Sequence, residues 1–137
     1  MKANELMLGD WVYGLYPNGK RYEPPFRISA VDIYPTNRSP RIVTEGGYGF
    51  QEEHLAPIPL TPEILEKNGI HYHNENNTYY WLNRKSFREF IQLEYASGGI
   101  WQVLCKGRLG HTRNSFGYIH QLQHALRLCG IEKEIVL

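Results

Sequence analysis

Short runs in which apolar and polar residues alternate occur throughout the first 60 residues, and this period of two predicts β-strands. The clearest run is residues 26–33, so one face of that strand should be buried. Residues 11–13, 41–44 and 48–50 are further short strands, and Asn18-Gly19 favours the positive φ angles of a type I′ hairpin turn. Such hairpin-linked strands predict a small twisted sheet or an SH3-like, partly closed barrel.

Pro57, Pro59 and Pro62 predict a rigid, extended connector, because proline fixes φ and cannot donate a hydrogen bond to a strand ladder. This connector is the best candidate for a boundary between a small β module, residues 1–60, and an α+β module, residues 61–137. One compact unit is the alternative. Thr61 suits the N-cap of a short helix that starts at Pro62 and stops at Gly69.

The second module again has β patterns, now combined with one strong helix. Strands are predicted over residues 70–73, 78–82, 87–95, 100–105 and 132–136. Residues 106–117, punctuated by three glycines, are expected to form a loop. The expected fold class is therefore α+β: an N-terminal SH3-like small β-barrel or twisted sheet, then an antiparallel sheet with one long C-terminal helix.

The strong helix is expected over residues 118–129, followed by Gly130 in the left-handed position that ends many helices. Spacing the residues at about 100° places an apolar stripe on one side, made of Tyr118, Ile119, Leu122, Ala125, Leu126 and Cys129. The opposite side carries polar residues that we expect to be exposed, namely His120, Gln123, His124 and Arg127.

The composition is that of a folded protein outside the membrane. The chain has 137 residues, 42% hydrophobic and 21% charged, which excludes disorder as the main state. No apolar stretch approaches the roughly 18 residues of a membrane span, so no membrane partner is expected. Charged residues near the start exclude a secretory signal. Cys105 and Cys129 form no CxxC pair, and we expect two reduced thiols in the cytoplasm.

The net charge of +1 conceals an asymmetry, because residues 95–131 contain no acid. The loop 106–117 brings three cations to the start of the strong helix, where free backbone N–H groups attract anions, and its glycines would allow a ligand to approach. The stretch predicts an anion or nucleic-acid site formed by Lys106, Arg108, His111, Arg113, His120, His124 and Arg127. The alternative is a solvated loop with Ser115 or Asn114 as a simple helix cap.

His120 and His124 stand four residues apart, the spacing at which two imidazoles can share a metal ion. The acid of an HExxH motif is missing, and the nearby Arg127 opposes a second cation, so we expect a polar helix face and no metal. There is no GxSxG elbow and no GxxxxGK[ST] loop, so no catalytic residue and no cofactor is predicted.

Aromatic residues permit two interpretations. One set gathers in the first 50 residues: Trp11, Tyr13, Tyr16, Tyr22, Tyr34 and Tyr48. These rings could stack on bases or hold a proline-rich peptide, or they could fill a thin core. In the second module, Tyr79, Tyr80 and Trp81 cannot all face one core, because consecutive strand residues alternate. Tyr80 or its two neighbours must therefore meet solvent, the helix or a partner.

Three segments resemble a family of short uncharacterised proteins from gut anaerobic bacteria and their phages or mobile elements. They are the opening Lys2-Ala3-Asn4-Glu5-Leu6 with Gly9-Asp10-Trp11-Val12, the middle segment 52–61 (EEHLAPIPLT), and the helix segment 118–123 (YIHQLQ). The resemblance implies a cytoplasmic accessory protein of phage or mobile-element type, and it supplies no activity.

The sequence therefore predicts a non-enzymatic binding or adaptor protein whose partner is protein or nucleic acid. One alternative is a nucleic-acid-binding protein that uses the basic stretch 95–131, and another is a small enzyme without a recognisable motif. Salt separates the first two, because counterion release makes nucleic-acid binding salt-sensitive, whereas an apolar protein interface barely responds. A deep pocket with convergent polar groups would favour the enzyme.

Overall fold

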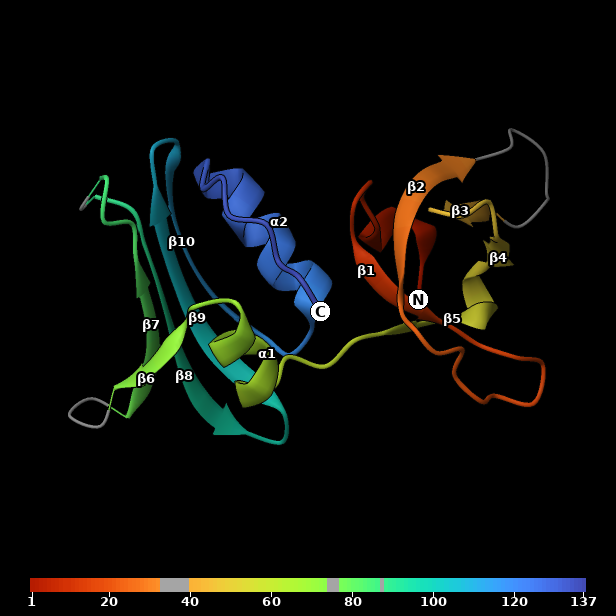
Figure 1. Ribbon diagram of the computed structural model, residues 1–137, viewed down its shortest axis with the longest axis horizontal. Helices are drawn as coiled ribbons and strands as arrows, with labels where there is room; N and C mark the ends of the chain where they lie inside the picture. The colour runs from red at the N-terminus through yellow and green to blue at the C-terminus, as the bar shows by residue number, and fades with distance from the viewer. Residues whose placement is uncertain (33–39, 74–76, 87) are drawn as a thin grey trace. The chain divides into compact units, whose positions relative to one another are not determined.

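The computed structural model describes residues 1–32, 40–73, 77–86 and 88–137 (Figure 1). The chain divides into two compact units, Met1–Ile58 and Pro59–Leu137. Each unit has a five-stranded antiparallel sheet, and the second also has two α-helices, so the fold class is α+β as predicted. Ile33, Tyr34 and Phe87, which belong to predicted strands or aromatic sets, lie outside the described residues, as does most of the turn between the predicted strands 70–73 and 78–82.

The first unit is an open sheet with the strand order β4-β3-β2-β1-β5. Its strands are β1 (Trp11–Gly14), β2 (Phe26–Asp32), β3 (Arg41–Thr44), β4 (Gly49–Gln51) and β5 (Leu55–Pro57). Among the described residues the sheet does not close, because β4 and β5 are its two edges. The predicted barrel is therefore not confirmed, and the open-sheet alternative describes this unit.

The core of the first unit lies on one face of this sheet. Alternate strand residues supply it, together with two side chains from the N-terminal segment: Ala3, Leu6, Val12, Ile28, Ile42 and Leu55. Aromatic rings continue it, since Tyr22 and Phe26 both contact Phe50. A Cβ at position 14 would lie 2.6 Å from the Phe50 ring, so Gly14 leaves the space that the ring fills. Of the rings that the sequence left open to two interpretations, Tyr22 thus packs in this partly buried cluster, whereas Tyr16 and Tyr48 are exposed.

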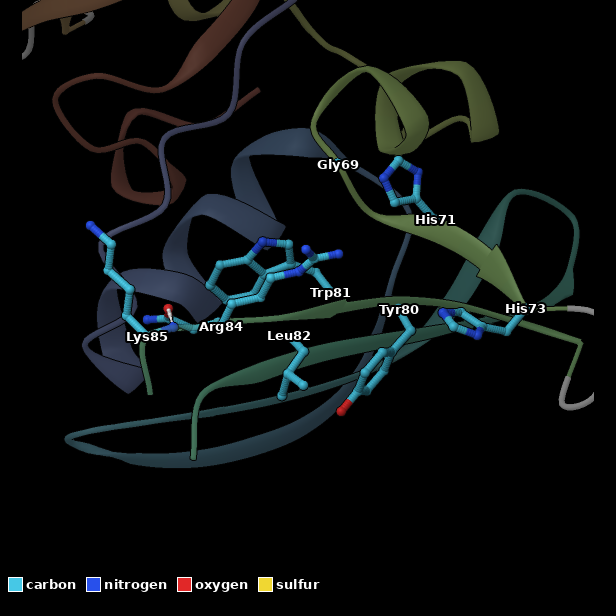
Figure 2. Close-up of a pocket in the computed structure, with 9 residues that line it drawn as sticks. Gly69, His71, His73, Tyr80, Trp81, Leu82, Arg84 and Lys85 are labelled. Carbon is cyan, nitrogen blue, oxygen red and sulfur yellow. Dashed lines mark hydrogen bonds between the residues drawn. The ribbon is translucent and has the colours of Figure 1, made fainter. Parts of the chain in front are cut away.

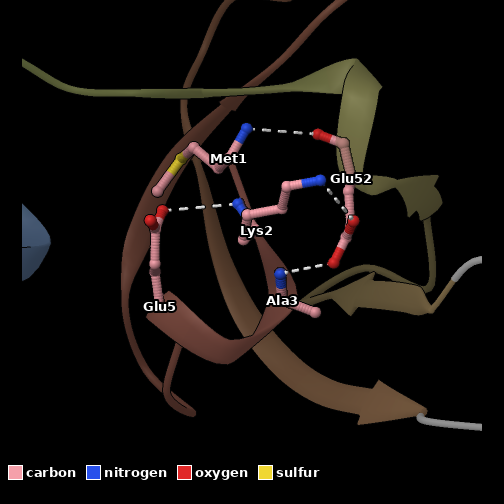
Figure 3. Close-up of polar contacts among 5 residues, drawn as sticks. All are labelled: Met1, Lys2, Ala3, Glu5 and Glu52. Atoms are coloured by element: carbon pink, nitrogen blue, oxygen red, sulfur yellow. Dashed lines mark hydrogen bonds and ion pairs between the residues drawn. The ribbon is translucent and has the colours of Figure 1, made fainter.

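The N-terminal segment is tied to this unit by Glu52, which lies in a 3₁₀ turn, Glu52–His54, between β4 and β5 (Figure 3). The Glu52 carboxylate accepts a hydrogen bond of 2.7 Å from the Ala3 N–H and lies 3.9 Å from the Lys2 ammonium group. The Met1 amino group donates to the Glu52 carbonyl at 3.4 Å. The contacts give Glu52 a structural role.

The hairpin turn before β2 has Gly19 at a φ of +80°, as the Asn-Gly signal predicts. Asn18 is not among the described residues with positive φ, so the turn is not type I′. The Gly19 N–H donates to the Tyr16 carbonyl at 2.8 Å, which is the pattern of a three-residue loop with glycine in the left-handed position.

The second unit has the strand order β10-β9-β8-β7-β6. Its strands are β6 (His71–His73), β7 (Thr78–Leu82), β8 (Phe90–Ser97), β9 (Ile100–Gly107) and β10 (Gly110–Phe116), and its helices are α1 (Pro62–Lys67) and α2 (Ile119–Cys129). The predicted loop 106–117 is wrong, because most of it is the end of β9 and the whole of β10. The cap of α1 is confirmed, since Thr61 Oγ1 accepts a hydrogen bond from the Ile64 N–H.

One face of the second sheet packs against α2. The strands contribute Ile91, Leu93, Trp101, Val103 and Cys105, and the helix contributes Ile119, Leu122 and Leu126, all of them at most 2% exposed. The Trp101 indole N–H donates to the Leu60 carbonyl at 3.0 Å, which satisfies the one polar group of this buried ring. The apolar stripe predicted for α2 is thus confirmed at its central positions.

The predicted last strand, residues 132–136, is wrong. The chain after α2 has no regular structure and runs back along the helix (Figure 1). The Asn68 side chain makes the hydrogen bonds to this segment that a neighbouring strand would otherwise make. Its amide group donates to the Val136 carbonyl and accepts from the Val136 N–H, both at 2.8 Å. A side-chain amide can satisfy one N–H and one C=O together, so the segment needs no strand partner there.

Candidate functional site

The hairpin of β9 and β10 determines where the predicted basic residues lie. Its register pairs His111 with Lys106 and Arg113 with Leu104. The intervening Thr112 lies 3.8 Å from the Cys129 thiol of α2, measured between Oγ1 and Sγ. Consecutive strand residues point to opposite faces, so His111 and Arg113 project from the face away from α2.

This face, which we call the open face, can be read row by row from the strand register. One row runs from β7 to β10 through Leu82, Phe90, Lys106 and His111. The next row runs through Tyr80, Gln92, Leu104 and Arg113. None of these eight residues is buried, whereas their neighbours on the other face of β8 and β9, namely Ile91, Leu93, Val103 and Cys105, are all buried. The open face therefore presents side chains to solvent in a regular grid.

Two aromatic rings lie together at the β7–β8 side of the open face. Tyr80 and Phe90 stack with their centroids 5.9 Å apart and an interplanar angle of 29°. The His73 ring meets Tyr80 edge-on at 5.6 Å. Tyr80 is therefore the member of the Tyr79–Trp81 run that faces away from the core, whereas Tyr79 packs against the buried Trp101.

Positive charge lies at the β9–β10 side of the same face. The charged side chains are those of Lys106 and Arg113, which are exposed, and the His111 imidazole is exposed beside them. Arg113 borders a small depression of about 30 Å³, together with Leu104 and the polar side chains of Gln92, Glu94 and Gln102. Glu94 thus brings one carboxylate to the edge of this basic area. The open face combines partly exposed rings on two strands with cations on the next two.

The other predicted site residues do not join Lys106, His111 and Arg113. Arg108 lies in the tight turn between β9 and β10 and is exposed. His120, His124 and Arg127 lie on α2, which packs on the opposite side of the sheet. His120 and Gln123 are each only 5% exposed, so their predicted place on an exposed helix face is wrong. Seven of the eleven residues of α2 are buried, because this helix is covered on more than the single side that an amphipathic pattern assumes.

The start of α2, where an anion site was predicted, has some of its N–H groups engaged within the chain, and the anion site itself stays a prediction. The Gly117 and Tyr118 N–H groups, which precede the helix, donate to the Gln121 side-chain oxygen at 3.1 and 3.2 Å. Two of the glycines in this stretch allow the close approach of other backbone segments of the chain. A Cβ at position 107 would overlap the Cys129 carbonyl oxygen, and one at 117 would lie 2.7 Å from the Gly99 carbonyl oxygen.

Histidine and cysteine chemistry adds little to this site. The His120 and His124 rings meet edge-on at 5.7 Å, and no group of three His, Cys, Asp or Glu side chains able to hold a metal ion occurs among the described residues. Burial raises the pKa of the Cys105 thiol to about 12, so this thiol stays protonated at neutral pH. A protonated, buried thiol is a poor nucleophile.

Sequence reasoning missed a pocket at one edge of the open face (Figure 2). Its volume is about 580 Å³, and its lining residues are Gly69, His71, His73, Tyr80, Trp81, Leu82, Asn83, Arg84 and Lys85. Arg84 and Lys85 follow β7, and the two histidines come from β6. Adjacent basic residues after a strand were a signal in the sequence, but the pairing of β6 with β7 was needed to bring the histidines beside them.

The chain matches no family model, and comparisons with curated proteins and with solved structures found no match. None of these comparisons bears on the resemblance to proteins of phages and mobile elements, which stays a prediction. None of the helices in the described residues is long and apolar enough to cross a membrane.

Proposed function

We propose that this chain is a non-enzymatic binding protein and that its open face binds single-stranded nucleic acid. The observation that carries the proposal is the strand register, which aligns the stacked rings of Tyr80 and Phe90 with Lys106, His111 and Arg113. Rings on a sheet can stack on bases while neighbouring cations meet the phosphates. The preferred ligand is then a single strand, because the bases of a duplex are not free to stack on a side chain.

The net charge of the whole chain is too small to attract nucleic acid non-specifically, so it agrees with binding at one local site. The net charge is +1, so binding has to come from the cations of the open face. The rings are half-buried at their strand sides, which holds them in place, and each stacked base is worth about 1–3 kcal/mol. We place this activity in the cytoplasm, where the two buried thiols stay reduced.

The charge test uses fluorescence anisotropy of a short labelled single strand and of a matching duplex, between about 50 and 200 mM salt. We expect the single strand to bind more tightly than the duplex, with an affinity that falls as salt rises. The double variant Lys106→Ala/Arg113→Ala should bind more weakly. Its slope of log affinity against log salt should be smaller by about 0.7 for each cation removed. Lys67→Ala is the matched control, since Lys67 is an exposed cation on α1.

The stacking test compares two aromatic residues of the same strand. Phe90→Ala removes a ring from the open face, and we expect the affinity to fall about 5- to 150-fold, the equivalent of one stacked base. Tyr95→Ala removes a ring that packs against Trp101 on the other face, with centroids 5.2 Å apart, and should leave the affinity unchanged. Equal losses in both variants, or no binding of the single strand at low salt, would refute the proposal. Salt-independent capture of a protein partner by the same face would favour the adaptor alternative.

A further inference from the structure

The pocket of Figure 2 exists because β6 is shorter than its neighbour. β6 pairs with β7 only over Thr78–Tyr80, so the backbone edge of β7 beyond Tyr80 has no strand beside it among the described residues. Tyr80 and Leu82 belong both to the wall of this pocket and to the rows of the open face. The pocket therefore adjoins the open face at these two residues.

The chemistry of the pocket favours an anion. Its nine lining residues include Arg84, Lys85 and two histidines, and none of the nine is an acid. Two carboxylates contact lining residues from outside and are engaged there: the Glu66 oxygens meet His71 Nδ1 at 2.7 Å and the Tyr72 N–H at 3.0 Å, and Glu89 accepts from the Asn83 side chain. These contacts also fix the His71 ring relative to β6. The pocket thus presents two permanent cations opposite two imidazoles.

Hydrogen bonds of Asn83 fix the backbone next to the two cations. The Asn83 side chain accepts from the Lys85 N–H at 3.0 Å and donates to the Glu89 carboxylate at 2.9 Å. The Asn83 N–H donates to the Glu89 carbonyl at 2.9 Å, which closes the base of the turn. Backbone that is fixed before a ligand binds does not have to be ordered on binding, so the turn lowers the entropic cost of using Arg84 and Lys85.

One aromatic ring of the pocket adds a surface for a planar group. Tyr80 lines the pocket from the open face, whereas Trp81 points to the other side of β7, where the Lys133 ammonium group lies 5.0 Å from the centroid of its ring (Figure 2). A volume of about 580 Å³ is in the range of small-molecule sites, which is roughly 300–1,000 Å³. The Tyr80 ring, the two cations and this size together suit one nucleotide.

We propose that this pocket receives the terminal nucleotide of a strand bound on the open face and recognises its terminal phosphate. The inference rests on the proposed function. A terminal phosphate monoester carries close to two negative charges at neutral pH, whereas each internal phosphodiester carries one. Arg84 and Lys85 therefore favour a phosphorylated end over the middle of the strand, and the pocket gives the open face a preference for strand ends.

The test compares three single strands of one sequence, with a 5′-phosphate, with a 3′-phosphate, or with hydroxyl groups at both ends. We expect one of the phosphorylated strands to bind the wild-type chain on the order of fivefold more tightly than the hydroxyl-ended strand. The identity of that strand shows which end enters the pocket. Arg84→Ala/Lys85→Ala should abolish this preference, and Arg88→Ala, an exposed cation outside the lining, should keep it. Circular dichroism checks that each variant is folded.

Each outcome decides one statement. Binding of all three strands with equal affinity overturns the role of the pocket and leaves the proposed function standing. A preference that survives in Arg84→Ala/Lys85→Ala also overturns it, because the phosphate is then recognised elsewhere. Failure of all three strands to bind overturns the proposed function and this inference together.

Discussion

The two faces of the second sheet are built from the same strands and differ in almost every physical respect. Toward α2 the strands send Ile91, Leu93 and Val103, each at most 1% exposed. Toward the open face they send Phe90, Lys106 and Arg113, none of them buried. A residue shift of one position along any of these strands would exchange the two sets.

This difference separates stability from binding within one sheet. The covered face gains the free energy of apolar burial, and the open face is free to carry charges and partly exposed rings that a core would not tolerate. The register that keeps Val103 inside is therefore the same register that aligns Tyr80 and Phe90 with the cations. Mutations should affect one property or the other according to the face on which they fall.

The largest effect is expected at the centre of the covered face. Leu122 is fully buried, so Leu122→Ala should lower the free energy of unfolding by about 2–5 kcal/mol. Leu128, in the same helix, is 68% exposed, and Leu128→Ala should change it by no more than about 0.5 kcal/mol. Chemical denaturation measures both. Similar losses would mean that the phase of α2 on the sheet is wrong.

A somewhat smaller effect is expected where the β9–β10 hairpin meets the end of α2. The Leu109 N–H donates to the Cys129 carbonyl at 2.9 Å, and a Cβ at position 107 would overlap that same carbonyl oxygen. Gly107→Ala should therefore destabilise the second unit by about 1–3 kcal/mol. Ser115→Ala, an exposed change on β10, serves as the control. An unchanged midpoint of denaturation for Gly107→Ala would show that the hairpin does not approach the helix so closely.

A weaker, pH-dependent effect is expected at the edge of the open face. The hydrogen bond from His71, with that from the Tyr72 N–H, lowers the pKa of the Glu66 carboxyl below its usual value. A carboxyl with a lowered pKa in the folded state contributes stability above its unfolded pKa, and this contribution is lost as the pH falls through about 4 and below. The melting temperature of Glu66→Gln should thus fall less than that of the wild type between neutral and acidic pH. Parallel curves for the two proteins would rule out this contact in solution.

The smallest effect on stability is expected on the open face itself. Arg113 is exposed, so Arg113→Ala should change the free energy of unfolding by no more than about 0.5 kcal/mol. The same variant should weaken binding of a single strand. Destabilisation comparable to that of Leu122→Ala would erase the distinction between the two faces.

Alternation and capping signals predicted the elements that have one apolar side. Thr61 and Gly130 gave the limits of the helices, and the run 78–82 gave β7. β10 escaped prediction because both of its sides are polar: Thr112 and Asn114 face one way, His111 and Arg113 the other. Because β10 is held mainly by backbone hydrogen bonds to β9, its sequence has no alternation of apolar and polar residues from which a strand could be predicted.

The candidate site was half predictable for a related reason. The absence of acidic residues between 95 and 131 indicated Lys106, His111 and Arg113 as site residues. The alternation of side chains along a strand indicated that Tyr80 or its two neighbours would point away from the core. The stacking of Tyr80 on Phe90 depends on the register of β7 against β8, which local sequence does not encode. His120 was misplaced because a helical pattern cannot show how many sides of a helix will be covered.

The most direct test of the two-face account is an NMR titration of the full chain with a short single strand. The ring resonances of Tyr80 and Phe90 report on the open face, and the indole N–H of Trp101, which is hydrogen-bonded to the Leu60 carbonyl, reports on the covered face. We predict saturable shifts of both open-face rings, with the Trp101 signal unmoved. Unmoved Tyr80 and Phe90 resonances, or a Trp101 signal that shifts as much as they do, would contradict the account.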